Sequence, residues 1–392
     1  MSLDNVSPIE VGERLRIARE TKGFTQAGAA AKIEVARTTL VAIEKGQRRV
    51  KIDELQKLAR CYETSVNALL RRESIHVDLV PRFRKLQKNT EDASSSAAQL
   101  LTDLAKAEIE LENLLGIKRS HNYPPERPLL PGNVKAQAEA DALELRQWLG
   151  LGNSPVRDII SVLEFDLGIR IYIRNLDQRV SGLFAHDERL GACMLLNANH
   201  PLERRALTAA HETGHFISTR MMPEVLHTDE QVTSREERYA NAFAHNFLMP
   251  ARAVMQKFEQ VTAGSSTLTR RHIIIIAYSF GVSREAMVMR LEELGLARTG
   301  TWSWFEENGR ITNAQARQVL GDLAPTDSVK SDAARPTTLR LNILAEEAWR
   351  QELLSEGQLA RLLHMDRPEL REILDGIETE GGQADGMPKL LD

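Results

Sequence analysis

Residues 208–218 read TAAHETGHFIS, in which two histidines stand four positions apart and a glutamate directly follows the first. On a helix, His211 and His215 project from successive turns of one face with about 40° between them, close enough for both imidazoles to reach one metal ion. Glu212 lies about 100° around the helix from His211, beside the metal without being a ligand. There it can take a proton from a water that zinc activates and deliver it to a leaving amine. The run taken alone predicts a helix that can hold a metal ion.

A catalytic zinc needs a third protein ligand and an open fourth position. The segment SREERYANAFAHNFLMP, residues 234–250, predicts a second helix that ends at Pro250. Glu237 falls on one face of this helix with Ala244 and Leu248, and a carboxylate on such an inward face is unusual for a solvated helix. Metal ligation explains that placement, so we predict Glu237 as the third ligand.

Two further features of this second helix bear on the site. Asn241, one turn after Glu237, is predicted to hold a ligand histidine in place. Ser234 and Glu237 also have the spacing of a capping box, in which Glu237 would only satisfy the helix start. Glu236 then remains open as the alternative ligand.

Three short runs with the period of strands precede the histidines. They are IRIYI, VSGLFAHD and ACMLLNA, within residues 169–198, and turn residues separate them. Strands in direct succession predict a small antiparallel sheet. With helical patterns over most of the remaining chain, the predicted fold class is α+β and predominantly helical.

The order of these motifs resembles the ImmA/IrrE family of zinc metallopeptidases. HETGH is preceded by strands and followed after 21 residues by ExxANxFA and LMP, and the resemblance covers roughly residues 165–295. It implies a zincin-like, gluzincin-type metalloendopeptidase domain, with Zn²⁺ held by His211, His215 and Glu237 and with Glu212 as the general base. A phenylalanine in FLMP stands where leucine is usual, which does not touch the chemistry.

The charge of the chain is distributed unevenly. The 392 residues carry a net charge of −4, but residues 1–72 hold 14 Lys and Arg against 9 Asp and Glu, which gives this head +5 and leaves −9 on the remaining chain. A basic head on an acidic body indicates that the head alone meets a polyanion.

The head reads as five short helices with tight turns. The third helix, ARTTLVAIEKG, has an inward face with Leu40 and Ile43 and a polar outward face, and basic residues follow it. A short exposed helix of this kind suits insertion into the major groove of DNA. The alternative is a small helical bundle that binds protein.

The segment TQAGAAAKIEVARTTLVAIEKGQRRVKIDELQKLARCYETSVNALL resembles the XRE-type helix-turn-helix (HTH) of phage repressors over nearly all of residues 9–72. Glu34 departs from the pattern, because the turn often carries glycine there. The candidate DNA contacts, from the outward face and from the resemblance, are Thr25, Gln26, Arg37, Thr38, Thr39, Ala42, Lys45 and Arg48.

Bulk properties exclude several classes of protein. No run approaches the roughly 20 apolar residues that cross a bilayer, and the N-terminus lacks the pattern of a secretory signal. Cys61 and Cys193 are the two cysteines, too few and too far apart for a disulfide framework. We therefore expect a cytoplasmic protein without a membrane partner.

Composition and motifs predict four regions. They are an HTH domain at 9–72, a helical linker region with a proline-rich connector at 73–132, a metallopeptidase domain at 133–298 and a helical region at 299–392. The connector, NYPPERPLLPG, contains four prolines that forbid a helix. Residues 355–374 are weakly similar to another HTH with acidic or neutral reading positions, which favours an interaction or packing role.

The leading functional hypothesis is a transcription regulator that binds a double-stranded DNA operator, as a homodimer, and carries a zinc metallopeptidase. The peptidase would hydrolyse a bond in a repressor, in another partner or in the regulator itself. One alternative is a non-proteolytic regulator whose zinc domain is a sensor. Another is an antitoxin-like repressor that neutralises a neighbouring protein, such as a toxin, by contact.

Overall fold

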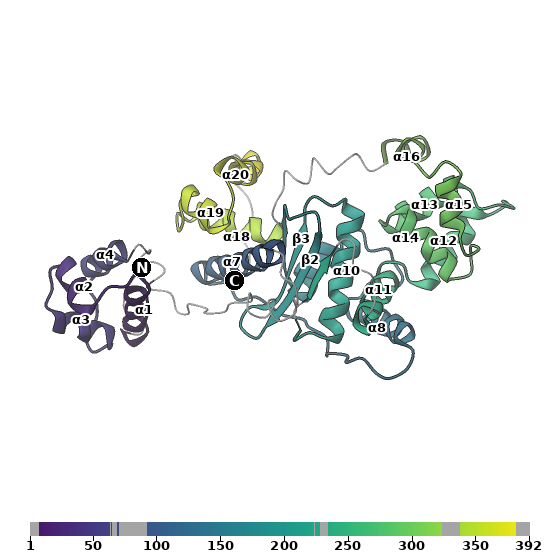
Figure 1. Ribbon diagram of the computed structural model, residues 1–392. Helices are drawn as coiled ribbons and strands as arrows, with labels where there is room; N and C mark the ends of the chain where they lie inside the picture. Colours follow the sequence, from purple (N-terminus) through teal and green to yellow (C-terminus); the bar gives the residue numbers. More distant parts are fainter. Residues whose placement is uncertain are drawn as a thin grey trace. The chain divides into compact units, whose positions relative to one another are not determined.

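The computed structural model describes residues 8–62, 64, 69, 92–222, 224–227, 234–323 and 338–381. Contacts divide the chain into two compact units, Met1–His76 and Val77–Asp392, and each is described by itself (Figure 1). The predicted fifth helix of the head and the first part of the predicted linker fall almost wholly outside the described residues. The predicted fold class, α+β and mostly helical, is confirmed.

The first unit is a small helical domain. Its described helices are α1 (Pro8–Thr21), α2 (Gln26–Lys32), α3 (Arg37–Glu44) and α4 (Ile52–Cys61). Leu15, Leu40 and Leu58 are fully buried in the core between them. Gly12 lets α1 approach α3 closely, because a Cβ at this position would lie 2.4 Å from the carbonyl oxygen of Ile43.

Helix α2 is capped at its start, and the turn that follows it contains one residue in a strained backbone conformation. Thr25 caps the start of α2, since its hydroxyl accepts from the N–H of Gly28 at 3.1 Å. Glu34 has a φ of 61°, the left-handed conformation that favours glycine. The turn therefore keeps its geometry although glycine is absent, and Glu34 bears the conformational free-energy cost of the left-handed backbone.

Replacing Glu34 with glycine should stabilise the first unit. The left-handed conformation costs a non-glycine residue about 1–2 kcal/mol, and the extra freedom of glycine in the unfolded chain returns about 0.5–1 kcal/mol of that. We expect a net gain of about 1 kcal/mol, measured as slower hydrogen exchange of the α2 and α3 amides in the full chain. Glu13→Gly, inside α1, is the control and should speed exchange. Faster exchange in Glu34→Gly would contradict the strain.

The second unit contains a sheet with strand order β1-β3-β2-β4 among the described residues. The strands are β1 (Arg170–Arg174), β2 (Val180–Asp187), β3 (Gly191–Asn197) and β4 (Glu224–His227). The three predicted strands are confirmed, and β4 was not predicted. β2 pairs antiparallel with β3 and with β4.

The sheet is mixed, and the prediction of a purely antiparallel sheet is wrong for β1. This strand pairs parallel with β3, with Tyr172 opposite Leu195. The connection from β1 to β2 passes the end of β3, which lies between them. The buried amide of Asn197 holds this connection, because it donates to the carbonyl oxygens of Asp177 (3.0 Å) and Val180 (2.7 Å).

Two long helices cover opposite faces of the sheet, α7 (Asp92–Leu115) and α10 (Leu202–Ser218) (Figure 1). The alternation along the strands separates the two faces. Phe184 of β2 contacts Phe216 of α10, with ring centroids 6.0 Å apart. On the other face Tyr172 of β1 donates a hydrogen bond to Glu108 of α7 at 2.6 Å.

A cluster of buried charges joins α7 to its neighbours. The guanidinium of Arg170 lies 3.1 Å from Glu108 and 2.7 Å from Glu112. Arg340, near the start of a C-terminal helix, lies 2.9 Å from Glu112, and Arg119 also pairs with Glu108. Burial alone would raise the pKa of Glu108, but Arg170 and Arg119 hold that pKa below its ordinary value.

The remaining helices surround this framework. They are α8 (Val134–Trp148), α9 (Ile159–Ser161), the π-helix η2 (Val162–Leu167), α11 (Arg235–Leu248), α12 (Ala251–Thr262), α13 (Arg270–Phe280), α14 (Arg284–Glu293), α15 (Thr301–Glu307), α16 (Asn313–Leu320), η3 (Gly321–Leu323), α18 (Leu339–Arg350), α19 (Glu356–Leu362) and α20 (Arg367–Gly381).

Within the described ranges, no single helix has the length and apolar character needed to cross a membrane. The pair α13 and α14 meets the length and composition criteria only when the two helices are taken together, across a bend of 99°.

Candidate metal centre and nucleic-acid interface

The two predicted site helices, α10 and α11, pack antiparallel. His211 of α10 faces Asn241 of α11. His215 lies one turn later on α10 and faces Glu237, which lies one turn earlier on α11. The close approach depends on Gly214, since a Cβ there would lie 2.9 Å from the Cα of Ala240. The glycine inside HETGH is therefore what lets the second helix reach the histidines.

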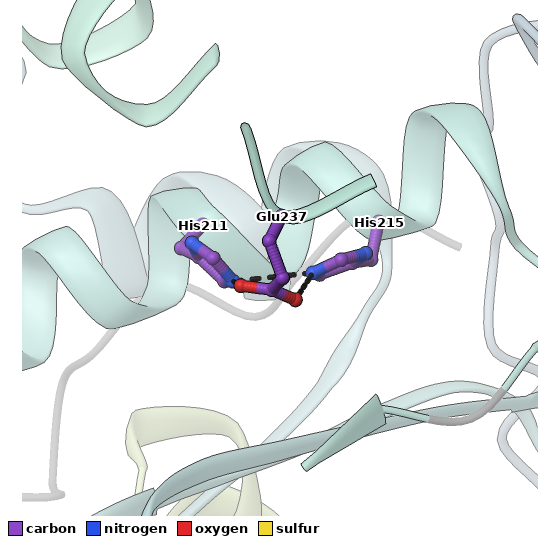
Figure 2. A group of neighbouring side chains, drawn as sticks. All are labelled: His211, His215 and Glu237. Atoms are coloured by element: carbon purple, nitrogen blue, oxygen red, sulfur yellow. Dashed lines mark hydrogen bonds and ion pairs between the residues drawn. The ribbon is translucent and has the colours of Figure 1, made fainter. Parts of the chain in front are cut away.

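Three side chains converge at one point between these helices. The Nε2 atoms of His211 and His215 lie 3.1 Å apart, and the Glu237 carboxylate lies 3.4 Å from the first and 3.1 Å from the second. Figure 2 shows both imidazoles and the carboxylate directed toward one another. In the described parts of the chain they form one group of possible metal ligands, with donor atoms within 4.8 Å of one another.

The spacing and type of these donors fit zinc. Two ligand atoms that each lie about 2.0–2.1 Å from a tetrahedral ion stand roughly 3.3 Å apart, and the three separations here are 3.1, 3.1 and 3.4 Å. Asn241 Oδ1 lies 3.1 Å from Nδ1 of His211. If that nitrogen carries the proton, Nε2 is left with a lone pair toward the site.

Burial shapes the electrostatics of the site. His211, Glu212 and His215 are buried, with at most 2% of their surface exposed. Burial lowers the pKa of His215, which favours the neutral imidazole that a metal requires. Burial would raise the pKa of Glu237, but hydrogen bonds with the two histidines hold that pKa well below its ordinary value.

The neighbouring carboxylates of α11 lie in different environments. Glu237 has its side chain 16% exposed and directed at the histidines, whereas Glu236 is exposed to solvent. The hydroxyl of Ser234 accepts from the backbone N–H of Glu237 at 3.0 Å. Ser234 thus caps α11 with its own side chain, while the Glu237 carboxylate points to the histidines.

A side chain at position 214 should disturb both packing and metal affinity. In Gly214→Ala the new Cβ forces α11 away from α10, at a cost of about 1–3 kcal/mol, and carries Glu237 and Asn241 away from the histidines. We expect a lower melting temperature and weaker Zn²⁺ binding in a competition titration. Glu203→Ala, in the first turn of α10, is the control. Unchanged zinc affinity in Gly214→Ala would contradict the role of this close approach.

The proline-rich connector, residues 122–132, lies within the second compact unit, although the sequence suggested a boundary there. The N–H of Arg127 donates to the carbonyl of Ile217 at 2.7 Å, near the end of α10. At its other end the carbonyl of Gly132 accepts from Arg235 at 3.2 Å, at the start of α11. The connector therefore bridges the two site helices at the end where His215 and Glu237 meet.

The predicted DNA contacts of the first unit fall into two groups. Arg37, Thr38 and Lys45 are exposed, and Thr39 and Ala42 of helix α3 are both half-buried. Three others have partners inside the unit. Thr25 caps α2, Gln26 donates to Glu44 at 2.9 Å, and Arg48 pairs with Glu54 at 2.9 Å.

A buried ion pair joins α1 to the end of α3. The guanidinium of Arg19, from α1, lies 2.7 Å from the Glu44 carboxylate at the end of α3. Because Gln26 of α2 binds the same carboxylate, Glu44 ties three helices together. The sequence carries no local signal of this pair, because Arg19 and Glu44 are 25 positions apart.

The turn between α2 and α3 recurs twice in the second unit. Glu34, Gly281 and His364 all have a left-handed φ, of 61°, 64° and 51°. In each case the next residue is apolar and donates its N–H to an alanine carbonyl five positions earlier, at 3.0, 3.2 and 3.0 Å. The weak similarity of residues 355–374 to an HTH therefore has a structural counterpart, and α13–α14 shows the same turn.

The helices that follow these three turns, α3, α14 and α20, differ in the charge of the side chains at corresponding positions. Where Lys45 follows α3, α14 has Glu292, whose carboxylate accepts from the backbone N–H groups of Gly300 and Trp302 at 3.0 and 2.9 Å. The corresponding residue of α20 is acidic, Asp375. At this position the residue after α3 is basic, whereas α14 and α20 carry an acidic residue, and α20 also has two exposed arginines, Arg367 and Arg371.

Family models match both functional regions. Residues 15–69 match the helix-turn-helix model, and residues 165–292 match the IrrE N-terminal-like domain of the M78 peptidases. The chain thus joins an XRE-type HTH domain to an ImmA/IrrE-type domain, as the sequence motifs indicated. No curated protein sequence matches the chain.

Solved structures show low similarity over nearly the full length. Apo ComR from S. thermophilus is 12% identical, with 97% of this chain and 100% of that chain covered and a TM-score of 0.16. PlcR from Bacillus thuringiensis, solved with the peptide PapR7 and DNA, has the same identity and coverage and a TM-score of 0.20. Apo ComR from Streptococcus vestibularis is 10% identical, covering 95% and 99%, with a TM-score of 0.16.

Proposed function

We propose that this chain is a DNA-binding transcription regulator whose second unit is a zinc-dependent metallopeptidase that hydrolyses a peptide bond in a regulatory protein. The observation that carries the proposal is the convergence of His211, His215 and Glu237 with separations suited to one tetrahedral ion. Glu212 adjoins the first of these ligands on the same helix. An HTH domain on the same chain supplies the link to transcription.

The residues of the site have distinct roles in this function. A bound Zn²⁺ supplies Lewis-acid polarisation of the peptide carbonyl and lowers the pKa of water. Asn241 fixes the ring of His211, so that Nε2 of His211 and of His215 are presented to one point. The carboxylate of Glu212 takes a proton from the attacking water and delivers it to the amide nitrogen that leaves.

Cleavage is tested with the full chain and Zn²⁺. The probes are a random peptide library and synthetic peptides that tile residues 63–91 of the chain itself, with products identified by mass spectrometry. New N-termini that appear only with zinc support hydrolysis. Intact probes in the zinc-loaded protein would overturn it.

Operator binding should depend on Arg37. This exposed arginine at the start of α3 can pair with a guanine edge in the major groove, which is worth about 1–3 kcal/mol, or roughly 5- to 150-fold in Kd. We expect Arg37→Ala to lose affinity by such a factor for a duplex selected from random DNA, measured by fluorescence anisotropy. Arg367→Ala, at the corresponding position of α20, is the matched control. Equal losses in the two variants would count against α3 as the reading helix.

Sensing without proteolysis is the second candidate function, and the position of α7 favours it. In sequence, α7 comes after the HTH unit. Arg170 of β1 forms ion pairs with the buried carboxylates of Glu108 and Glu112 on this helix. A change in the sheet can therefore reach α7, the first helix after the HTH domain in the part of the second unit that the structure describes. Zinc-dependent operator affinity in Glu212→Gln, with no peptide product from the wild type, would favour this function. The homodimer and the cytoplasmic location remain predictions.

A further inference from the structure

The edge of the sheet at β1 is capped by side chains. β1 is an end strand of the sheet in the described part of the chain, and alternate residues of a strand direct their backbone groups to the same edge. Three alternate carbonyls of β1 and the residue before it each accept a hydrogen bond from a side chain. The pairs are Ile169 with Arg119 (2.6 Å), Ile171 with Thr338 (3.0 Å) and Ile173 with Arg174 (3.0 Å). An open strand edge can pair with another chain, so these side chains protect it.

The cap from Thr338 comes from a distant part of the chain. Thr338 is buried and directly precedes α18, 167 positions after the carbonyl that it binds. In the first turn of α18, the backbone N–H of Arg340 donates to the carboxyl group of Glu164 at 3.2 Å, and its guanidinium donates to Glu112 of α7 at 2.9 Å. Residues 338–340, which we call the edge cover, are thus held by polar contacts with β1, η2 and α7.

Glu164 is a buried acidic group that the proposed reaction does not use. It is 3% exposed and lies in the π-helix η2, a rare kind of element that often occurs at functional sites. Burial raises the pKa of Glu164 to about 7, and the charge of Glu108 on α7 contributes to the rise. Hydrogen bonds from Thr338 and Arg340 and the charge of Arg119 act in the opposite direction. The docked edge cover therefore favours the protonated carboxyl group.

The direction of the pH dependence follows from this shift. When the edge cover leaves η2, Glu164 meets water and its pKa returns toward the ordinary value of 4.5. A carboxyl group whose pKa is higher in the docked state binds its proton more tightly there. Docking is therefore strongest at low pH and weakens as the pH rises from 4.5 through about 7.

We propose that Glu164 is a pH-sensitive latch for the edge cover: the neutral carboxyl group keeps residues 338–340 on the edge of β1, and the ionised carboxylate releases them. Release uncovers the carbonyl of Ile171 and separates Arg340 from the carboxylates of α7. The latch operates whether or not the metal site cleaves peptides.

The latch is tested by hydrogen exchange of the full-length protein at about pH 5.5 and about pH 8. Protection of the α18 amides, corrected for the intrinsic exchange rate at each pH, measures docking. We expect this protection to be roughly 10- to 50-fold lower at the higher pH, whereas the α10 amides keep theirs within about 2-fold. Glu164→Gln keeps the size of the side chain but cannot ionise, so its α18 ratio should be about 2-fold or less.

Asp103→Asn is the matched control. Asp103 of α7 lies 4.0 Å from His364, in an ion pair that forms only when the histidine is protonated, and so offers another source of pH dependence. This variant should keep the wild-type ratio. Equal protection of α18 at the two pH values in the wild type overturns the latch without any variant. A ratio that Glu164→Gln leaves unchanged, or one that Asp103→Asn abolishes, overturns it as well.

Discussion

Glu212→Gln should abolish peptide cleavage while zinc and DNA binding remain intact. Glutamine is nearly isosteric with glutamate but cannot accept and return the proton, and loss of a general base costs about 100- to 10,000-fold in rate. Glu212 is fully buried on α10, next to His211 and one turn before His215. Because it adjoins the ligands without being one of the converging donors, its removal leaves the metal-binding set complete.

The measurement is a time course of product formation by mass spectrometry, at equal zinc occupancy. Operator affinity measured in parallel shows that the protein is folded and that the HTH unit is active. Glu203→Ala, in the first turn of the same helix, serves as the control and should cleave at the wild-type rate. Wild-type cleavage by Glu212→Gln with zinc bound would remove Glu212 from the role of base.

Glu237→Ala should lose zinc affinity by at least about 100-fold, because even residues that only support a metal ligand cost 10- to 100-fold when removed. Its carboxylate lies within 3.4 Å of both histidine Nε2 atoms, and the alanine variant leaves two protein ligands where a catalytic zinc needs three. The affinity is measured by competition with a chromophoric chelator at fixed pH.

Glu236→Ala is the matched control for this measurement. It removes the same charge one position away on the same helix, but from a side chain exposed to solvent. Its zinc affinity should equal that of the wild type. Equal losses in the two variants would show a general effect of charge, and a loss only in Glu236→Ala would assign the third ligand to that residue.

Local spacing accounts for the features that were predictable. His211 and His215 lie on one helix, where a separation of four positions determines a common face whatever surrounds it. The HTH domain follows from the same rule, because its helices are short and its inward positions are set by their periodicity. Strands β1 to β3 were identified by their alternation and turn residues for the same reason.

Contacts between distant segments account for what the sequence left open. β1 pairs with β3 because β3 lies between β1 and β2 in the sheet. The residue pattern of a strand does not specify which strand lies beside it. The prolines of the connector correctly excluded a helix, but the hydrogen bonds of Arg127 to α10 and of Arg235 to the connector depend on residues about 90–105 positions apart. Such contacts have no local signature.

The sequence by itself determined the two histidines, the adjacent glutamate and the HTH domain, because each depends on side chains within a few turns of one another. The tertiary structure decided which carboxylate of α11 faces the histidines, through the close approach at Gly214. It also distinguished α3 from α14, whose Glu292 accepts from the backbone N–H groups of Gly300 and Trp302, since such partners depend on what packs against each helix. Periodicity determines the face of a helix, and only packing determines what that face meets.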